Sequence, residues 1–163
     1  MSQTIDSKID LKLFLLFIPV AYISYLFHEF GHWTVGEILG NDMAYSLNYV
    51  WAKNGSYIDS SHDLYVSIGG PIFTLCQSII FLLILQRYRT IYIYPFLFFP
   101  MFMRFFSIVL GGFSKQDEAR ISSILNIGTY TVAIIVLTIL FLIVLRASQI
   151  LRIDIKTNGF FFQ

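Results

Sequence analysis

The sequence predicts an all-α, polytopic membrane protein. First, 56% of its 163 residues are hydrophobic and only 13% are charged, whereas a typical soluble domain carries about 25% charged residues. Second, the apolar residues gather in long segments, several of which reach the ~20 residues that a helix needs to cross a bilayer. The bilayer is therefore an expected partner. The net charge of +1, without a basic cluster, argues against nucleic acid as a partner.

Four segments are predicted to be spanning helices: residues 11–39, 64–85, 91–111 and 126–145. Only the polar residues of one short motif interrupt the first segment. The third contains two prolines and a single charge, Arg104, and the fourth is free of charge up to Arg146. Since neither an internal repeat nor a flexible linker separates these segments, we expect one membrane domain over residues 1–163.

The connections between the segments carry two local signals. In "NDMAYSLNYVWAKNGSYIDSSHD", Asn54 and Gly55 separate two aromatic, partly alternating runs. This pattern predicts a β-hairpin with a two-residue turn between the first two helices. In "GGFSKQDEARISSIL", the glycine pair predicts a break after the third helix. Ser114 is then expected to cap a short helix that has Asp117 near its start.

The basic residues of the loops predict the orientation of the chain. If the N-terminus is cytoplasmic, three basic residues lie on the outer side: Lys53, Lys115 and Arg120. The inner side then holds Lys8, Lys12, Arg87, Arg89, Arg146, Arg152 and Lys156. Cytoplasmic loops of membrane proteins carry the excess of lysine and arginine. We therefore expect a multi-pass protein with both termini in the cytoplasm.

The pentapeptide "HEFGH" predicts a zinc site inside the first helix. His28 and His32 are four residues apart, so they lie on one helix face and can reach one ion. Glu29 can then project beside the metal and accept a proton from the water that the metal polarises. A polar patch that faces other helices is the alternative interpretation. Ionisable residues within a span are costly and usually functional, which favours one Zn²⁺ per chain.

A catalytic zinc needs a third protein ligand and one open position for water. Two crossings separate the end of the first helix from the loop "SKQDEAR", so both lie on the same side of the membrane. Asp117 is therefore the predicted third ligand, and Glu118 is the alternative. The helix dipole also favours an acidic residue in a first turn, and this structural role for Asp117 stays open. His62 is expected to be a solvated loop residue.

These motifs resemble the site-2 protease family of intramembrane zinc metalloproteases. "HEFGH" in a first transmembrane helix and "SIGGPIFTL" at residues 67–75 carry the resemblance, which covers roughly residues 11–120. It implies a histidine pair and a glutamate on one helix, joined by an aspartate from a later helix. Gly70 and Pro71 match the family's glycine–proline motif. Thr74 stands where many members have asparagine, and the family's leucine–aspartate–glycine motif is missing, so Asp117 is assigned by chain order and membrane side.

Five residues are expected to contact the substrate or the transition state: Arg104, Gly70, Pro71, Asn54 and Gly55. An arginine within a span usually faces a cavity or pairs with a carboxylate. Arg104 could hold Asp117 or Glu118, or stabilise an oxyanion; snorkelling to the interface is the alternative. Related proteases carry a β-structured loop after the first helix, and such a strand could pair with an extended substrate. The alternative is a loop anchored at the interface by its tyrosines and tryptophan.

Together these residues predict a zinc-dependent intramembrane endopeptidase. His28, His32 and Asp117 would bind zinc, and Glu29 would act as the general base on a peptide bond in or next to a membrane-embedded segment. The substrate would be a membrane protein or a membrane peptide. Two alternatives stay open: a catalytically inactive protease-like scaffold or regulator, and a zinc hydrolase that acts on a non-peptide bond.

Overall fold

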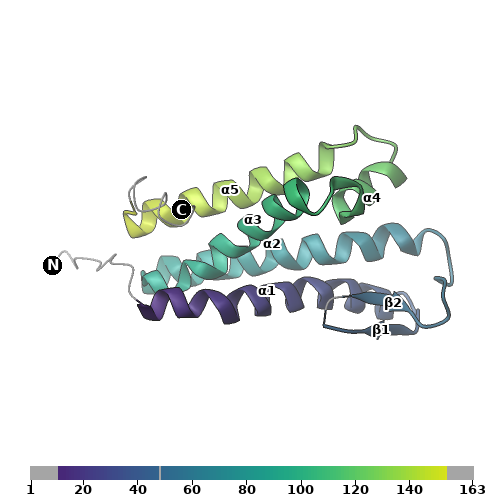
Figure 1. Cartoon of the computed structure of the whole chain (residues 1–163), viewed down its shortest axis with the longest axis horizontal. Coiled ribbons are helices and arrows are strands. Elements are labelled where there is room, and N and C mark those ends of the chain that lie inside the picture. The colour runs from purple at the N-terminus through teal and green to yellow at the C-terminus, as the bar shows by residue number, and fades with distance from the viewer. Residues whose placement is uncertain (1–10, 48, 154–163) are drawn as a thin grey trace.

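The structure, a computed structural model, describes residues 11–47 and 49–153 (Figure 1). Its main helices are α1 (Leu11–Ile38), α2 (His62–Tyr88), α3 (Pro95–Leu110) and α5 (Thr131–Leu151). A short helix, α4 (Asp117–Ile124), and two strands, β1 (Met43–Tyr45) and β2 (Val50–Ala52), complete the fold. The 3-10 turns Ile91–Ile93 and Phe113–Lys115 precede α3 and α4. Both α1 and α5 pack against α2 and α3.

Within the described residues, four helical stretches are long and apolar enough to cross a membrane: Leu11–Ile38, His62–Tyr88, Ile91–Leu110 and Thr131–Leu151. Many of their large apolar side chains point outward, as they do at Phe14, Ile80 and Phe141. A bilayer is the solvent in which such an outer surface is stable. The predicted fold class, an all-α polytopic membrane protein with a β-hairpin after its first helix, is confirmed.

Two glycines let α1 and α2 cross at close range. A Cβ built on Gly31 would lie 2.5 Å from the carbonyl oxygen of Gly69, and a Cβ on Gly69 would lie 2.5 Å from that of Gly31. Small residues allow this kind of backbone approach between membrane helices. The crossing places the face of α1 that carries the two histidines directly against α2.

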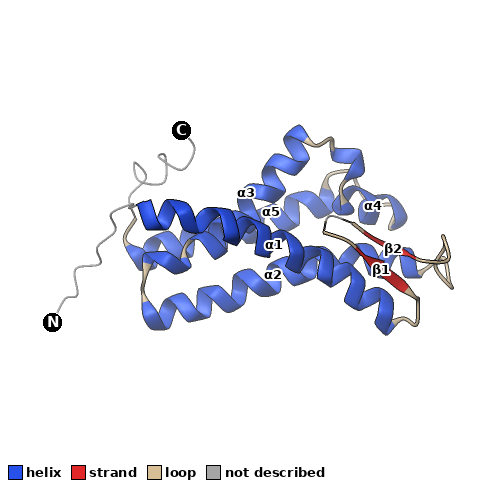
Figure 2. Cartoon of the chain, turned by 60° about the horizontal axis from the view of Figure 1, so that its bottom comes forward, coloured by secondary structure: helices blue, strands red, loops and turns tan. Residues whose placement is uncertain are grey.

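The hairpin and α4 lie at the same end of the molecule, away from the start of α1 and the end of α5 (Figure 1). The hairpin folds back along the C-terminal half of α1 (Figure 2). The hydroxyl of Tyr45 donates a hydrogen bond to the carbonyl of Leu26 at 2.9 Å. Because Leu26 lies twelve residues before the end of α1, the hairpin reaches about 18 Å back along that helix at 1.5 Å per residue.

The predicted position of the hairpin turn was wrong. The strands pair in the register Met43↔Ala52, Ala44↔Trp51 and Tyr45↔Val50, so both lie before Asn54. The loop closes where Ser46 N–H donates to the carbonyl of Tyr49 at 2.9 Å. Met43, Val50 and Ala52 turn inward onto Val66 of α2, and this burial sets the register. Asn54 and Gly55 form the next turn instead, with a φ of 79° at Gly55.

Two further boundaries differ from the sequence prediction. The last helix runs over 131–151 rather than 126–145, because Asn126 takes a left-handed φ of 52° before it and Arg146 stays exposed on its surface. Arg146 donates to the side chain of Gln149 and does not end the helix. Ser114 does not cap the short helix: it lies in a 3-10 turn, and Gln116 holds the N-cap position of α4.

Candidate metal centre

α1 presents His28 and His32 one turn apart, and both side chains are buried. Their Nε2 atoms lie 3.2 Å apart. α2 makes room for them at Gly70, where a Cβ would collide with both imidazole rings. The glycine of the "GGP" motif is therefore required by close packing on the two histidines.

The Nδ1 atom of each histidine contacts a polar group of α2. His32 Nδ1 lies 2.6 Å from the carbonyl oxygen of Val66, and because a carbonyl only accepts, this nitrogen carries the proton. His28 Nδ1 lies 3.0 Å from Oγ1 of Thr74, a hydroxyl that can donate or accept. Both Nε2 atoms are left facing each other. Partners of this kind fix the orientation of metal-binding histidines.

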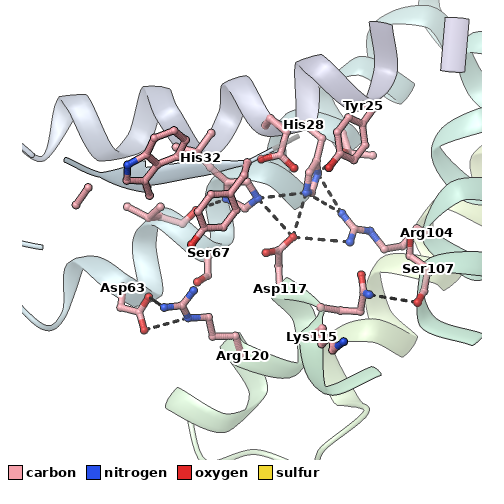
Figure 3. Close-up of a pocket in the computed structure, with 18 of the residues that line it drawn as sticks. Tyr25, His28, His32, Asp63, Ser67, Arg104, Ser107, Lys115, Asp117 and Arg120 are labelled. Atoms are coloured by element: carbon pink, nitrogen blue, oxygen red, sulfur yellow. Dashed lines mark hydrogen bonds and ion pairs between the residues drawn. The ribbon is translucent and has the colours of Figure 1, made fainter. Parts of the chain in front are cut away.

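Asp117 reaches the two histidines from α4 (Figure 3). Its Oδ2 lies 3.0 Å from His28 Nε2 and 3.4 Å from His32 Nε2. The chain turns back after α3 at Gly112, which has a φ of 87°, and so brings the start of α4 over the α1–α2 crossing. The structure therefore joins the histidine pair and the aspartate that the sequence singles out, although they are far apart in the chain.

The chemistry of the three side chains fits a cation. One ligand atom from each of His28, His32 and Asp117 lies within 4.8 Å of the others. Burial alone would raise the pKa of Asp117, but its hydrogen bonds with the two histidines outweigh burial and hold that pKa well below its usual range. The carboxylate is therefore charged. When His32 is neutral with its proton on Nδ1, its Nε2 atom offers a lone pair. Acceptor atoms this close repel one another unless a shared proton or a metal ion lies between them.

Glu29 lies beside the three residues without joining them. It is half-buried and lines a cavity of about 1180 Å³ that also contains His28, His32 and Asp117. Its carboxylate forms a hydrogen bond with Tyr25, one turn earlier on α1. The helix therefore directs the glutamate into the same cavity as the ligand atoms.

Glu118, the alternative ligand, lies outside this group. It is completely buried and pairs with Arg104 of α3, whose Nε lies 3.0 Å from Oε1 and whose Nη1 lies 3.3 Å from Oε2. Arg104 lies near the site as well: its Nη1 is 3.7 Å from Asp117 Oδ2, and its Nη2 is 3.0 Å from His28 Nδ1. The two neighbouring acids of α4 thus share Arg104, but the histidine contacts belong to Asp117.

The other residues predicted to contact the substrate differ in whether they line the cavity. Pro71 is buried in α2 directly after Gly70. Gly55 lines the cavity, whereas Asn54 is not among its lining residues. His62 is not the solvated loop residue that the sequence predicts. It begins α2, is partly buried, and lies 3.1 Å from the side-chain nitrogen of Asn41.

Sequence reasoning missed two contributors to the site and one ion pair between helices outside the metal-binding group. Thr74 follows Gly70 by four residues on α2, so the helical period could have placed it on the same face. Tyr25 stands in the same relation to Glu29 on α1. The ion pair between Arg120 and Asp63, which joins α4 to α2, has no local signal, because it depends on tertiary packing.

The fold and the site define the chain as a multi-pass helical membrane protein with a candidate metal-binding group. Comparisons with models of known protein families, with curated proteins and with solved structures found no significant match.

Proposed function

We propose that this protein is a zinc-dependent intramembrane endopeptidase. One observation carries the proposal: Asp117 of α4 meets the Nε2 atoms of His28 and His32 at 3.0 and 3.4 Å. Two imidazoles and a carboxylate are a typical ligand set of catalytic zinc, which keeps its remaining position for water or substrate. We assign one Zn²⁺ per chain to these ligands. When bound, zinc acidifies a water molecule and polarises a carbonyl group.

Glu29 is assigned the role of the general base. It accepts a proton from the attacking water while the oxygen–carbon bond to the carbonyl carbon forms. It then delivers that proton to the amide nitrogen, and the carbon–nitrogen bond breaks. The hydrogen bond with Tyr25 limits the movement of the Glu29 carboxylate and so supports its orientation toward the cavity.

The walls of the cavity favour an extended peptide as the substrate. Strand β2, with Val50, Trp51 and Ala52, lines the cavity. Within the described residues, β2 pairs only with β1, so its second edge offers unpaired backbone groups. A peptide bond in a membrane helix must lose its helical hydrogen bonds before attack. Pairing with the edge of β2 would replace those bonds by β-augmentation. The substrate is thus a membrane protein or peptide with a segment that unwinds.

The distribution of basic residues supports an orientation as well. Both chain ends would face the cytoplasm, and α4, the hairpin and the metal-binding group would lie toward the opposite side. Cysteine labelling at exposed Ser56 and Ser114, compared with labelling near the C-terminal end, tests this assignment. Labelling of both loops from the cytoplasmic side would contradict it.

Glu29→Gln tests the proposed chemistry. The variant should bind about one zinc per chain, as the unmodified protein does, because Glu29 is not a ligand. It should cleave none of the transmembrane peptides that the unmodified protein cleaves, since the amide cannot accept the proton. His28→Ala should lose both zinc and cleavage. Peptide products are identified by mass spectrometry after reaction in lipid nanodiscs. Cleavage that survives in Glu29→Gln would falsify the assignment.

A further inference from the structure

Arg104 is an unusual cation for a metal site. Its side chain is 10% exposed, it belongs to a membrane-spanning helix, and it lines the same cavity as Glu29. Nη2 lies 3.1 Å from His28 Nε2, one of the three ligand atoms. Snorkelling, the alternative expected from the sequence, does not fit this burial. The guanidinium lies beside the ligand atoms of His28 and Asp117.

Glu118 holds one edge of the guanidinium. Its Oε2 accepts a hydrogen bond from Nη1 at 3.3 Å, and its Oε1 lies at ion-pair distance, 3.0 Å, from Nε. Glu118 is completely buried and is not among the residues that line the cavity. It therefore anchors Arg104 from behind and leaves Nη2 on the side of the metal ligands. This ion pair restricts the orientation of the guanidinium, which a solvated arginine would not share.

The charges in this arrangement call for an anionic ligand. A positive charge beside two metal ligands repels a divalent cation and weakens metal binding. Burying the guanidinium also requires a second buried charge, and buried ion pairs contribute little stability on balance. Arg104 therefore weakens metal binding and contributes little to the stability of the fold. A negative charge that forms next to the metal would offset that repulsion, because hydrogen bonds from charged donors are strong in a dry site.

We propose that Arg104, anchored by Glu118, is a binding subsite for the negatively charged oxygen that forms on the attacked carbonyl group. This inference rests on the proposed peptidase function. As the water oxygen bonds to the carbonyl carbon, the electrons of the C=O double bond move onto the carbonyl oxygen, and Nη2 donates a hydrogen bond to it. When the carbon–nitrogen bond breaks, these electrons return and the interaction weakens. Arg104 keeps its proton throughout, and Glu118 is a positioning residue.

Metal affinity and anion affinity should then change in opposite directions. Arg104→Met should bind Zn²⁺ as tightly as the unmodified protein or more tightly, because a repelling charge is gone. The zinc-loaded variant should bind methylphosphonate, a small tetrahedral anion, about 10–100-fold more weakly, the loss expected for a charged hydrogen bond. Glu118→Gln should lower zinc affinity about 10–100-fold, because it leaves the Arg104 charge unneutralised.

Two further variants control the experiment. Arg120→Gln removes an arginine that also lines the cavity but is 55% exposed in its pair with Asp63; both affinities should stay within about threefold. Arg104→Met/Glu118→Gln leaves no unpaired buried charge, so it keeps the test valid if Arg104→Met fails to fold. This double variant should hold zinc and lose methylphosphonate affinity. Zinc is measured by chelator competition, methylphosphonate by calorimetry, and folding by thermal unfolding.

Turnover measurements distinguish a failure of the anion subsite from a failure of the proposed peptidase function. For any peptide that the protein cleaves, Arg104→Met should lower kcat about 100–1000-fold, as the loss of one oxyanion donor does, with little change in KM. The subsite is refuted if folded Arg104→Met, or the double variant, binds methylphosphonate like the unmodified protein, or if it loses zinc. If Glu29→Gln still cleaves peptides while Arg104 governs anion binding, the general-base assignment fails and the anion subsite stands.

Discussion

Gly70→Ala tests the geometry of the metal centre with a single carbon atom. A Cβ at position 70 would lie 2.6 Å from His28 Nε2 and 2.5 Å from His28 Cε1, and it would also collide with His32. Carbon contacts are comfortable at about 3.5–4.0 Å, so each ring must move by about 1 Å. Metal–ligand distances tolerate only about 0.2 Å. We expect zinc affinity to fall at least about 100-fold, beyond the usual effect of an outer-shell change.

Gly36→Ala is the matched control on α1. The three atoms nearest to its Cβ would all belong to the side chain of Met43, at 2.6–2.8 Å, and an unbranched thioether can shift. Both substitutions place alanine in a helix interior, where it is favoured over glycine by about 0.8–1.0 kcal/mol. Zinc affinity is measured by chelator competition in nanodiscs, alongside thermal unfolding. If folded Gly70→Ala binds zinc within about threefold of Gly36→Ala, the two imidazoles do not form the site.

Three other substitutions probe the surroundings of the site. Thr74→Val removes the partner of His28 Nδ1 and should lower zinc affinity about tenfold, while Thr74→Ser should restore it; equal affinities for all three proteins would exclude this role. Tyr25→Phe should keep zinc but lower kcat, since Glu29 loses its hydrogen bond, and an unchanged kcat would contradict that link. Asp63→Asn breaks the exposed pair with Arg120 and should reduce stability in thermal unfolding by less than about 1 kcal/mol; a loss of zinc would show instead that this pair is needed to hold α4.

The sequence allowed the spanning helices and the histidine pair to be predicted, because both depend on local pattern. Apolar segments of bilayer length are visible without tertiary information, and the helical period alone aligns His28 with His32. Asp117 required one more step, the count of membrane crossings. That count narrowed the choice to two adjacent acids but could not assign their partners, since the pairing of Glu118 with Arg104 depends on how α4 packs on α3.

The errors have a common physical origin in tertiary burial. Asn54 and Gly55 carry a strong local turn signal, yet the strands pair before them because Met43 and Val50 bury their side chains against α2. The charge of Arg146 predicts the end of a span, but an exposed arginine can lie on a helix that continues to Leu151. In both cases the residues have the local structure expected of them, a turn and an exposed charge, but the strand or helix ends elsewhere.

The separation of the ligands in the chain affects the order in which the site can form during synthesis. His28 and Asp117 are 89 positions apart, so the ribosome completes α1, α2 and α3 before it reaches the aspartate. A nascent chain that stops earlier holds both histidines but lacks their carboxylate. The full ligand set first exists when α4 turns back onto the inserted helices. A truncated chain would therefore lack the complete zinc ligand set of the finished protein.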